Sequence, residues 1–404
     1  MRILLVNSVC GVTSTGRICT DLAKAYLENG HEVKIAYGRV DKGMPEECET
    51  YSKRIGTDFD VKLHGFQTRF FDRHGFGSCR ATKQFLKWVD GYKPDVIHLH
   101  NLHGYYINVE LLFRYIKERN IPTVWTLHDC WAMTGHCTHF NAEGCEKWKT
   151  QCTHCPLKQA YPSSKFLNQS EKNHLEKRSA FTGVKNMVIA TPSAWLKSIV
   201  KQSFLRDCEV QVVNNGIDTA IFKPTPSELR KQYGLEGKKI ALGVANGWGP
   251  HKGLKYLQQM AMDLPDEWKV VAVGLSDEQL TQLPAGMLGI QRTNSPRELA
   301  AWYTTADVFV NPTLEDTYPT TNLEAQACGT PVVSFDSDGA AETVAPGAGA
   351  VVPRMNYSQL VDMVIQEAAH KAHFVIPPIK DKRSLSGDYE RLYRSILADK
   401  ERCS

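Results

Sequence analysis

Short apolar runs alternate with longer amphipathic segments along most of this chain. Runs rich in Val, Ile and Leu are typical of buried strands, and apolar residues repeated every three or four positions indicate helices. The expected strands cover residues 3–7, 33–37, 96–100, 123–127, 188–191, 210–214, 240–245, 269–273, 289–292, 308–311 and 331–334. The expected helices cover residues 18–29, 82–91, 110–119, 166–181, 194–202, 254–263, 297–306, 360–369 and 386–399. Strands that alternate with helices predict parallel sheets covered on both faces.

The alternation breaks in the polar, proline-containing stretch at 224–228. A chain of 404 residues is also too long for one ordinary core. We therefore predict an α/β protein with two doubly wound parallel-sheet domains, 1–222 and 223–384, which face each other across a cleft. That cleft is the expected ligand site. Residues 385–404 follow a second proline break and are expected to form an amphipathic helix.

Composition narrows the class of protein. The chain has 48 basic and 44 acidic residues, a net charge of +4, which is too slight to indicate nucleic acid as a partner. The first residues read as a buried strand rather than a signal peptide, and no stretch is long and apolar enough to span a bilayer. We therefore expect a cytoplasmic protein, in which twelve cysteines stay reduced.

One segment combines positive charge with aromatic residues and has two interpretations. It reads as the exposed side of a helix, which we favour, or as a face that lies peripherally on an anionic membrane. The residues concerned are Arg69, Arg73, Arg80, Lys83, Lys87 and Lys93, interleaved with Phe66, Phe70, Phe71, Phe85 and Trp88.

The stretch 312–333 holds the most informative chemistry. Glu315 and Asp316 lie in an acidic turn after an apolar strand, and Glu324 lies in the apolar helix that follows. Open α/β sheets bind ligands where a strand ends and a helix begins. The alternative, a solvated acidic loop, leaves Glu324 unexplained.

Two other turns join a strand to a helix and contain glycine. Gly16, next to Arg17, allows close approach of a phosphate or sugar to a helix start, and Lys252 lies in the turn 249–253. Either turn alone also fits a purely geometric role. No G-x-G-x-x-G or Walker sequence follows a strand, which argues against dinucleotide and NTPase chemistry.

Four cysteines cluster in the loop 130–156: Cys137, Cys145, Cys152 and Cys155. Three interpretations remain open, namely a structural zinc site, disulfides and unbonded thiols. His136, His139 and His154 are alternative ligands.

Taken together, these motifs resemble a known family. They are Gly16-Arg17, Gly30-His31-Glu32-Val33, Asp95-Val-Ile-His98, Thr126-Leu-His128, Asn214-Asn-Gly-Ile-Asp218, Lys252-Gly253 and the block 312–333. In this order they resemble the retaining GT-B glycosyltransferases of family 4, over nearly the whole chain. The run Trp125-Thr-Leu-His-Asp129 with Trp131, Thr134-Gly135 and Cys137 is most similar to the colanic-acid, exopolysaccharide subgroup.

The resemblance implies roles for matching residues. His128 would contact the donor sugar near the reacting carbon, Lys252 would bind the donor diphosphate, and Glu324 would hold the ribose. Glu315 or Asp316 would contact the donor sugar, and Gly16 would lie on the acceptor side near the diphosphate.

Two departures from the family pattern concern individual positions. The family spacing places Asp316, not a glutamate, eight positions before Glu324. Asn246 and Gly247 stand where many members have an arginine for the diphosphate. Two consequences are open: the loss of this cation weakens donor binding, or Arg17 or another group offsets it.

The resemblance also implies fold and function. The fold would be two Rossmann-like domains, with the C-terminal helix crossing back to the first. The activity would be transfer of a sugar, with retention, from a nucleotide-diphosphate sugar to a saccharide or polyprenyl-diphosphate-linked acceptor at the inner face of the plasma membrane. No cofactor would be needed for catalysis. The alternative is a non-catalytic GT-B protein that binds nucleotide sugar or glycan.

Overall fold

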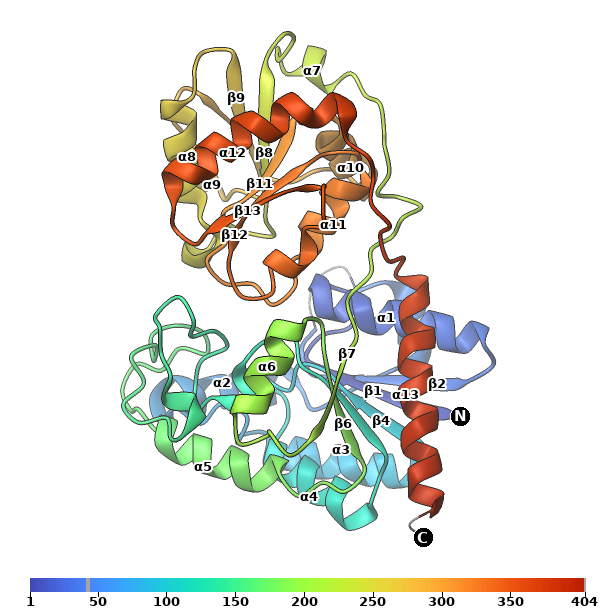
Figure 1. Ribbon diagram of the computed structural model, residues 1–404. Coiled ribbons are helices and arrows are strands. Elements are labelled where there is room, and N and C mark those ends of the chain that lie inside the picture. The colour runs from blue at the N-terminus through green and yellow to red at the C-terminus, as the bar shows by residue number, and fades with distance from the viewer. Residues whose placement is uncertain (41–43, 403–404) are drawn as a thin grey trace. The chain divides into compact units, whose positions relative to one another are not determined.

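The computed structural model describes residues 1–40 and 44–402 and contains two α/β units (Figure 1). The first unit comprises Met1–Asn214 together with the chain from Arg383 onward, and the second comprises Asn215–Lys382. Residues 403–404 of the expected C-terminal helix lie outside the described residues. No described helix combines the length and apolar character that a membrane crossing requires.

Within the described residues, the first unit has a seven-stranded parallel sheet in the order β3-β2-β1-β4-β5-β6-β7. The strands are β1 (Arg2–Asn7), β2 (Glu32–Tyr37), β3 (Ser52–Arg54), β4 (Val96–Leu99), β5 (Thr123–Thr126), β6 (Met187–Thr191) and β7 (Glu209–Val212). The helices are α1 (Thr13–Glu28), α2 (Asp58–Phe71), α3 (Cys79–Tyr92), α4 (Val109–Arg119), α5 (Ser170–Phe181), α6 (Ala194–Gln202) and α13 (Arg383–Arg402), with short 3-10 turns η1 (Glu46–Tyr51), η2 (Trp131–Met133) and η3 (Lys147–Lys149).

The second unit has, in its described residues, a six-stranded parallel sheet in the order β10-β9-β8-β11-β12-β13. The strands are β8 (Lys239–Val244), β9 (Trp268–Val273), β10 (Met287–Ile290), β11 (Val308–Asn311), β12 (Val332–Asp336) and β13 (Gly349–Pro353). The helices are α7 (Leu229–Gln232), α8 (Leu254–Asp263), α9 (Asp277–Leu280), α10 (Pro296–Thr305), α11 (Thr320–Ala327) and α12 (Tyr357–His370), with 3-10 turns η4 (Pro250–Lys252), η5 (Ala341–Thr343) and η6 (Lys371–His373).

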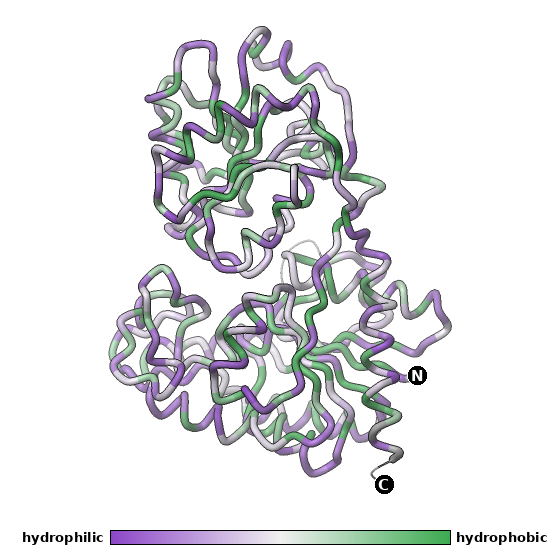
Figure 2. The backbone as a smooth tube through the Cα atoms, viewed as in Figure 1, coloured by the Kyte–Doolittle hydropathy of each residue, from purple (hydrophilic) through white to green (hydrophobic). Residues whose placement is uncertain are grey.

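Apolar side chains cover both faces of each sheet, which explains the apolar runs in the sequence. Figure 2 shows hydrophobic segments along the strands inside each unit. The predicted pair of doubly wound parallel sheets is therefore confirmed. The helix expected from residue 166 begins at Ser170 instead, because Gln169 donates its backbone N–H to Asp72 Oδ2 (2.7 Å).

The C-terminal helix α13 packs inside the first unit, against α1 and β5 (Figure 1). Its Tyr389 and Tyr393 are buried. Tyr389 accepts a hydrogen bond from Thr126 Oγ1 (2.9 Å), and Tyr393 bonds His98 Nδ1 (2.6 Å). The helix thus returns to the first unit, as expected, and contacts the strands that lead to a candidate site.

The strand orders decide where ligands bind. In both sheets the first strand of the unit lies between the second and the fourth, so the chain reverses its direction of growth there. Such a switch point leaves a crevice at the carboxyl ends of the two central strands, where open α/β sheets bind their ligands. We therefore expect ligand sites beyond β1 and β4 in the first unit and beyond β8 and β11 in the second.

Candidate functional site

At the switch point of the second unit, the turn after β8 is tied to the turn after β11. His251 O accepts from Leu314 N–H (2.7 Å) and from Thr313 Oγ1 (3.3 Å). Gly253 begins α8 with φ +79°, and a Cβ there would lie 2.0 Å from Pro312 O. Only glycine suits both this left-handed conformation and this contact. The sequence therefore brings the basic turn and the acidic turn together through backbone geometry.

One ion pair and one contact between a histidine and a carboxylate connect these turns. Lys252 Nζ lies 2.6 Å from Asp316 Oδ2, and His251 Nδ1 lies 3.3 Å from Glu315 Oε2. The side chains differ in access, since that of Asp316 is 21% exposed and that of Glu315 only 3%. Asp316 is thus the acid that shares an accessible position with the lysine.

Glu324 lies on α11, which follows the acidic turn. Its Oε2 accepts a hydrogen bond from Tyr303 Oη (2.9 Å) on α10. Burial, followed by the Glu324 carboxylate, raises the pKa of Tyr303 above its usual value. The phenol therefore stays protonated and fixes one carboxylate oxygen. Asn246, by contrast, is exposed in the loop after β8.

In the first unit, a histidine cluster surrounds the end of β5. His128 Nε2 lies 3.0 Å from His100 Nδ1, and the two rings stack. His103 forms two hydrogen bonds: Nε2 bonds Asp129 Oδ2 (2.7 Å), and Nδ1 bonds Tyr161 Oη (3.2 Å). These side chains come from the segments that follow β4 and β5, next to the switch point.

The charges of this cluster follow from its burial. Burial lowers the pKa of His128 to about 4, although Asp129 acts in the opposite direction. Burial also disfavours the Asp129 carboxylate, but the charge and hydrogen bond of His103 outweigh it and lower the pKa of Asp129 to about 2. At neutral pH the site therefore presents a neutral imidazole beside an ionised carboxylate.

Gly16 and Arg17 lie in the first turns of α1, beyond β1. Gly16 is buried, and a Cβ there would lie 3.1 Å from Val9 Cγ2. Arg17 is exposed. This close packing explains the glycine at position 16 without any ligand. The N-terminus of α1 can still bind an anionic ligand.

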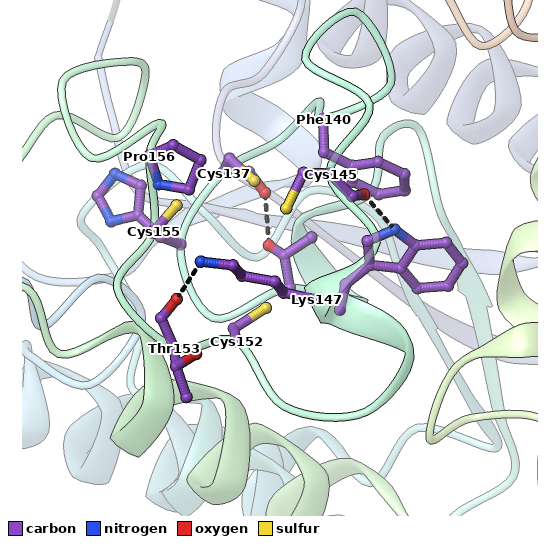
Figure 3. Close-up of a pocket in the computed structure, with 11 residues that line it drawn as sticks. Cys137, Phe140, Cys145, Lys147, Cys152, Thr153, Cys155 and Pro156 are labelled. Atoms are coloured by element: carbon purple, nitrogen blue, oxygen red, sulfur yellow. Dashed lines mark hydrogen bonds between the residues drawn. The ribbon is translucent and has the colours of Figure 1, made fainter.

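The side chains of the four cysteines Cys137, Cys145, Cys152 and Cys155 line one small pocket in the first unit (Figure 3). All four are free thiols, so the structure contains none of the disulfides considered above. Across residues 1–40 and 44–402, no group of three or more His, Cys, Asp or Glu side chains is arranged to hold a metal ion as it stands.

The sequence reasoning missed several polar side chains at these sites. His251 had a signal, because it precedes Lys252 in the same turn. His103 and Tyr303 had none, because their partners Asp129 and Glu324 lie 26 and 21 residues away. Only the packing of separate elements brings them to the sites.

The geometry defines a class of protein with two Rossmann-like units and polar side chains gathered near the switch point of each sheet. The chain matches the model described as "Glycosyltransferase Family 4" over residues 15–221, more than half its length. It matches the model described as "Glycosyl transferases group 1" over residues 238–369. The chain therefore belongs to glycosyltransferase family 4, and the family that the motifs indicated is confirmed.

Several individual proteins are similar to this chain. A putative colanic acid biosynthesis glycosyl transferase of Escherichia coli K12, WcaC, is 28% identical over 386 residues, which cover 91% of each chain. Sucrose-phosphate synthase from Thermosynechococcus elongatus has the same fold, with a TM-score of 0.74 at 16% identity over 98% of this chain and 99% of that one. Anabaena HepE, solved with UDP and glucose, gives 0.65 at 15% identity over 98% and 100%. This protein is thus a GT-B glycosyltransferase similar to the colanic-acid enzyme.

Proposed function

We propose that this glycosyltransferase moves a hexose, with retention, from a nucleotide-diphosphate sugar to a saccharide or polyprenyl-diphosphate-linked acceptor in exopolysaccharide assembly. The observation that carries the proposal is the grouping at the second switch point of Lys252, Asp316 and Glu315, with Glu324 on the following helix. It offers one cation for a diphosphate and carboxylates for sugar hydroxyls.

The chemistry requires groups of these types. Breaking the sugar–phosphate bond places negative charge on the departing diphosphate, which Lys252 and the N-terminus of α8 would stabilise without a metal. The lysine would exchange Asp316 for phosphate oxygens when the donor binds. We assign Asp316, rather than the more buried Glu315, to the sugar-contacting acid, because its carboxylate lies beside the ammonium.

The first unit would supply the remaining polar contacts. A neutral His128 can form one hydrogen bond with a hydroxyl of the donor sugar, because a neutral imidazole has one N–H and one acceptor nitrogen. It adds no charge near the reacting carbon. The described site suggests no nucleophile, so the acceptor hydroxyl would attack directly and pass its proton to the leaving phosphate. That course retains the configuration at the anomeric carbon. Gly16 and Arg17 would lie near the diphosphate.

A donor panel tests the proposed function. Purified protein is incubated with UDP-, GDP- and ADP-sugars and a lipid extract as acceptor, without added divalent cation. We expect nucleotide release with one donor and a product whose anomeric configuration, read by NMR, matches the donor. Binding of a nucleotide sugar with neither release nor transfer would contradict the proposal.

We also propose that the first unit lies against an anionic membrane, where a lipid-linked acceptor would be found. Helix α2 exposes Phe59 (72%) and Phe66 (50%), and Phe166 (63%) stacks on Phe70 beside them. Leu63, Phe71 and Leu167 are also exposed, and Lys62, Arg69 and Lys165 supply positive charge. Phe85 from the expected basic-aromatic face is instead buried in the core.

Replacing Phe66 and Phe166 by glutamate is expected to lower binding to phosphatidylglycerol vesicles by at least about tenfold, because each phenyl ring contributes roughly 1.5–3 kcal/mol when buried. Co-sedimentation with vesicles measures this. Val375, 80% exposed in the second unit, provides the control variant Val375→Glu. Equal binding by all variants, or no preference for anionic over phosphatidylcholine vesicles, would exclude this surface.

A further inference from the structure

The cysteine pocket lies in a part of the first unit that has little regular structure. Between β5 and α5, the described chain forms only the short turns η2 and η3. Such a segment cannot bury much apolar surface through helices or strands, and a bound metal is a common way to stabilise one. Phe140 and Trp148 stack against each other and form an apolar wall of the pocket.

Four thiols reach this pocket from three positions along the loop. Cys152 and Cys155 form a C-x-x-C turn, and Cys137 and Cys145 approach from the preceding stretch (Figure 3). Lys147 stabilises the C-x-x-C turn, because its Nζ donates to Thr153 O (2.9 Å) and more weakly to His154 O (3.4 Å). The backbone of the turn is thus fixed independently of the thiols.

A buried histidine beside the pocket lacks a partner on one side. His136 lines the pocket, and its Nδ1 bonds Asp72 Oδ1 at 2.5 Å, with both side chains fully buried. Its Nε2 is buried and has no hydrogen-bond partner among the described residues. A buried polar atom without a hydrogen-bond partner lowers the stability of the fold. We therefore expect a group bound in the pocket to interact with this nitrogen. A carboxylate on the far nitrogen is typical of histidines that bind a metal ion.

A buried lysine lies beside the pocket. Lys177 is fully buried, near Cys152 and Cys137, and its Nζ donates to Trp131 O (2.8 Å) and Thr134 O (3.0 Å). Both acceptors are uncharged carbonyl oxygens. Among the described residues, no carboxylate forms an ion pair with Lys177. A zinc ion held by four thiolates carries net negative charge, which would stabilise a buried ammonium beside it.

We propose that Cys137, Cys145, Cys152 and Cys155 bind one zinc ion as thiolates. The donor set is that of structural zinc sites, which are closed and four-coordinate. The thiols line the pocket without forming a finished site, so zinc would draw the loop inward. The anionic centre would lie beside Lys177, and Asp72 would hold the ring of His136 at the edge of the pocket. The site is structural and independent of the donor chemistry.

Metal content of the full chain tests this proposal. Protein purified from cells grown without added zinc is expected to contain about one zinc per chain by mass spectrometry of the metal. The double variant Cys152→Ser, Cys155→Ser should retain less than about a tenth of that zinc, since a closed site needs all its ligands. Cys79→Ser, at an exposed thiol outside the loop, is the matched control and should keep it.

A second measurement applies even if the double variant does not fold. Zinc is removed from the unaltered protein with a chelator, and thiols are counted by a chromogenic disulfide reagent before and after. Release of zinc together with four newly reactive thiols supports the site. Purified protein that holds no stoichiometric zinc, or in which the four thiols already react or are oxidised to disulfides, overturns it.

Discussion

Lys252→Ala is expected to lower kcat/KM for the nucleotide sugar by about 10²–10³-fold, the usual effect of removing one group that stabilises developing negative charge. The ammonium lies on the turn before α8, 2.6 Å from Asp316, where a diphosphate would displace the carboxylate. Without it, the second unit would stabilise the leaving group only through the backbone N–H groups at the start of α8. Released nucleotide, measured at several donor concentrations, gives the change in kcat/KM.

Folding should be nearly unaffected by this substitution. The side chain of Lys252 is 39% exposed, and exposed ion pairs contribute at most about 1 kcal/mol. Lys255→Ala is the matched control, because Lys255 is an exposed lysine at the start of α8, three residues after Lys252. Its ammonium contacts the face of Tyr256. The control should keep its rate, and both variants should melt near the parent. A Lys252→Ala enzyme with the parent's kcat/KM would remove this lysine from the site.

Glu324→Ala is expected to lower kcat/KM by about 10–100-fold. The reason is that hydrogen bonds to a charged group contribute roughly 1.5–3 kcal/mol. One carboxylate oxygen of Glu324 is held by Tyr303. If the carboxylate binds the ribose in both ground and transition states, the loss should appear mainly in KM. Initial rates over a range of donor concentrations separate KM from kcat.

Two further variants show whether the carboxylate itself binds the donor. Tyr303→Phe removes only the hydroxyl that orients Glu324, so it should raise KM by a smaller factor than Glu324→Ala. Glu236→Ala replaces an exposed glutamate elsewhere in the second unit and should change neither constant. If Tyr303→Phe impairs the enzyme while Glu324→Ala does not, Glu324 is not a donor ligand.

The local pattern of apolar and polar residues predicted most of the fold, because buried strands and amphipathic helices each have a characteristic spacing of apolar residues over a short stretch. The missed elements depend on their neighbours. Strand β3 has only three residues and joins the sheet through pairing with β2, and β13 begins at Gly349 and ends at Pro353. Helix α2 was not expected because it exposes Phe59 and Phe66, which conceal the usual amphipathic pattern.

The candidate site was predicted in part for the same reason. Lys252, Asp316 and Glu324 were found because each lies in a turn or helix with a recognisable local setting. Their partners were not found, because hydrogen bonds such as that between Tyr303 and Glu324 join elements whose separation in sequence carries no signal. The resemblance to a family supplied roles, but not the choice between Glu315 and Asp316.

The sequence by itself determined two parallel-sheet units, the family and the segments that carry polar chemistry, since all of these depend on short-range pattern and motif. Tertiary structure decided which side chains meet. Strand order placed the turn with Lys252 beside the turn with Asp316, and the return of α13 set Tyr393 against His98. It also gathered four thiols around one pocket beside His136. The physical reason is that contacts between distant segments follow from packing of the whole unit, which no local stretch of sequence encodes.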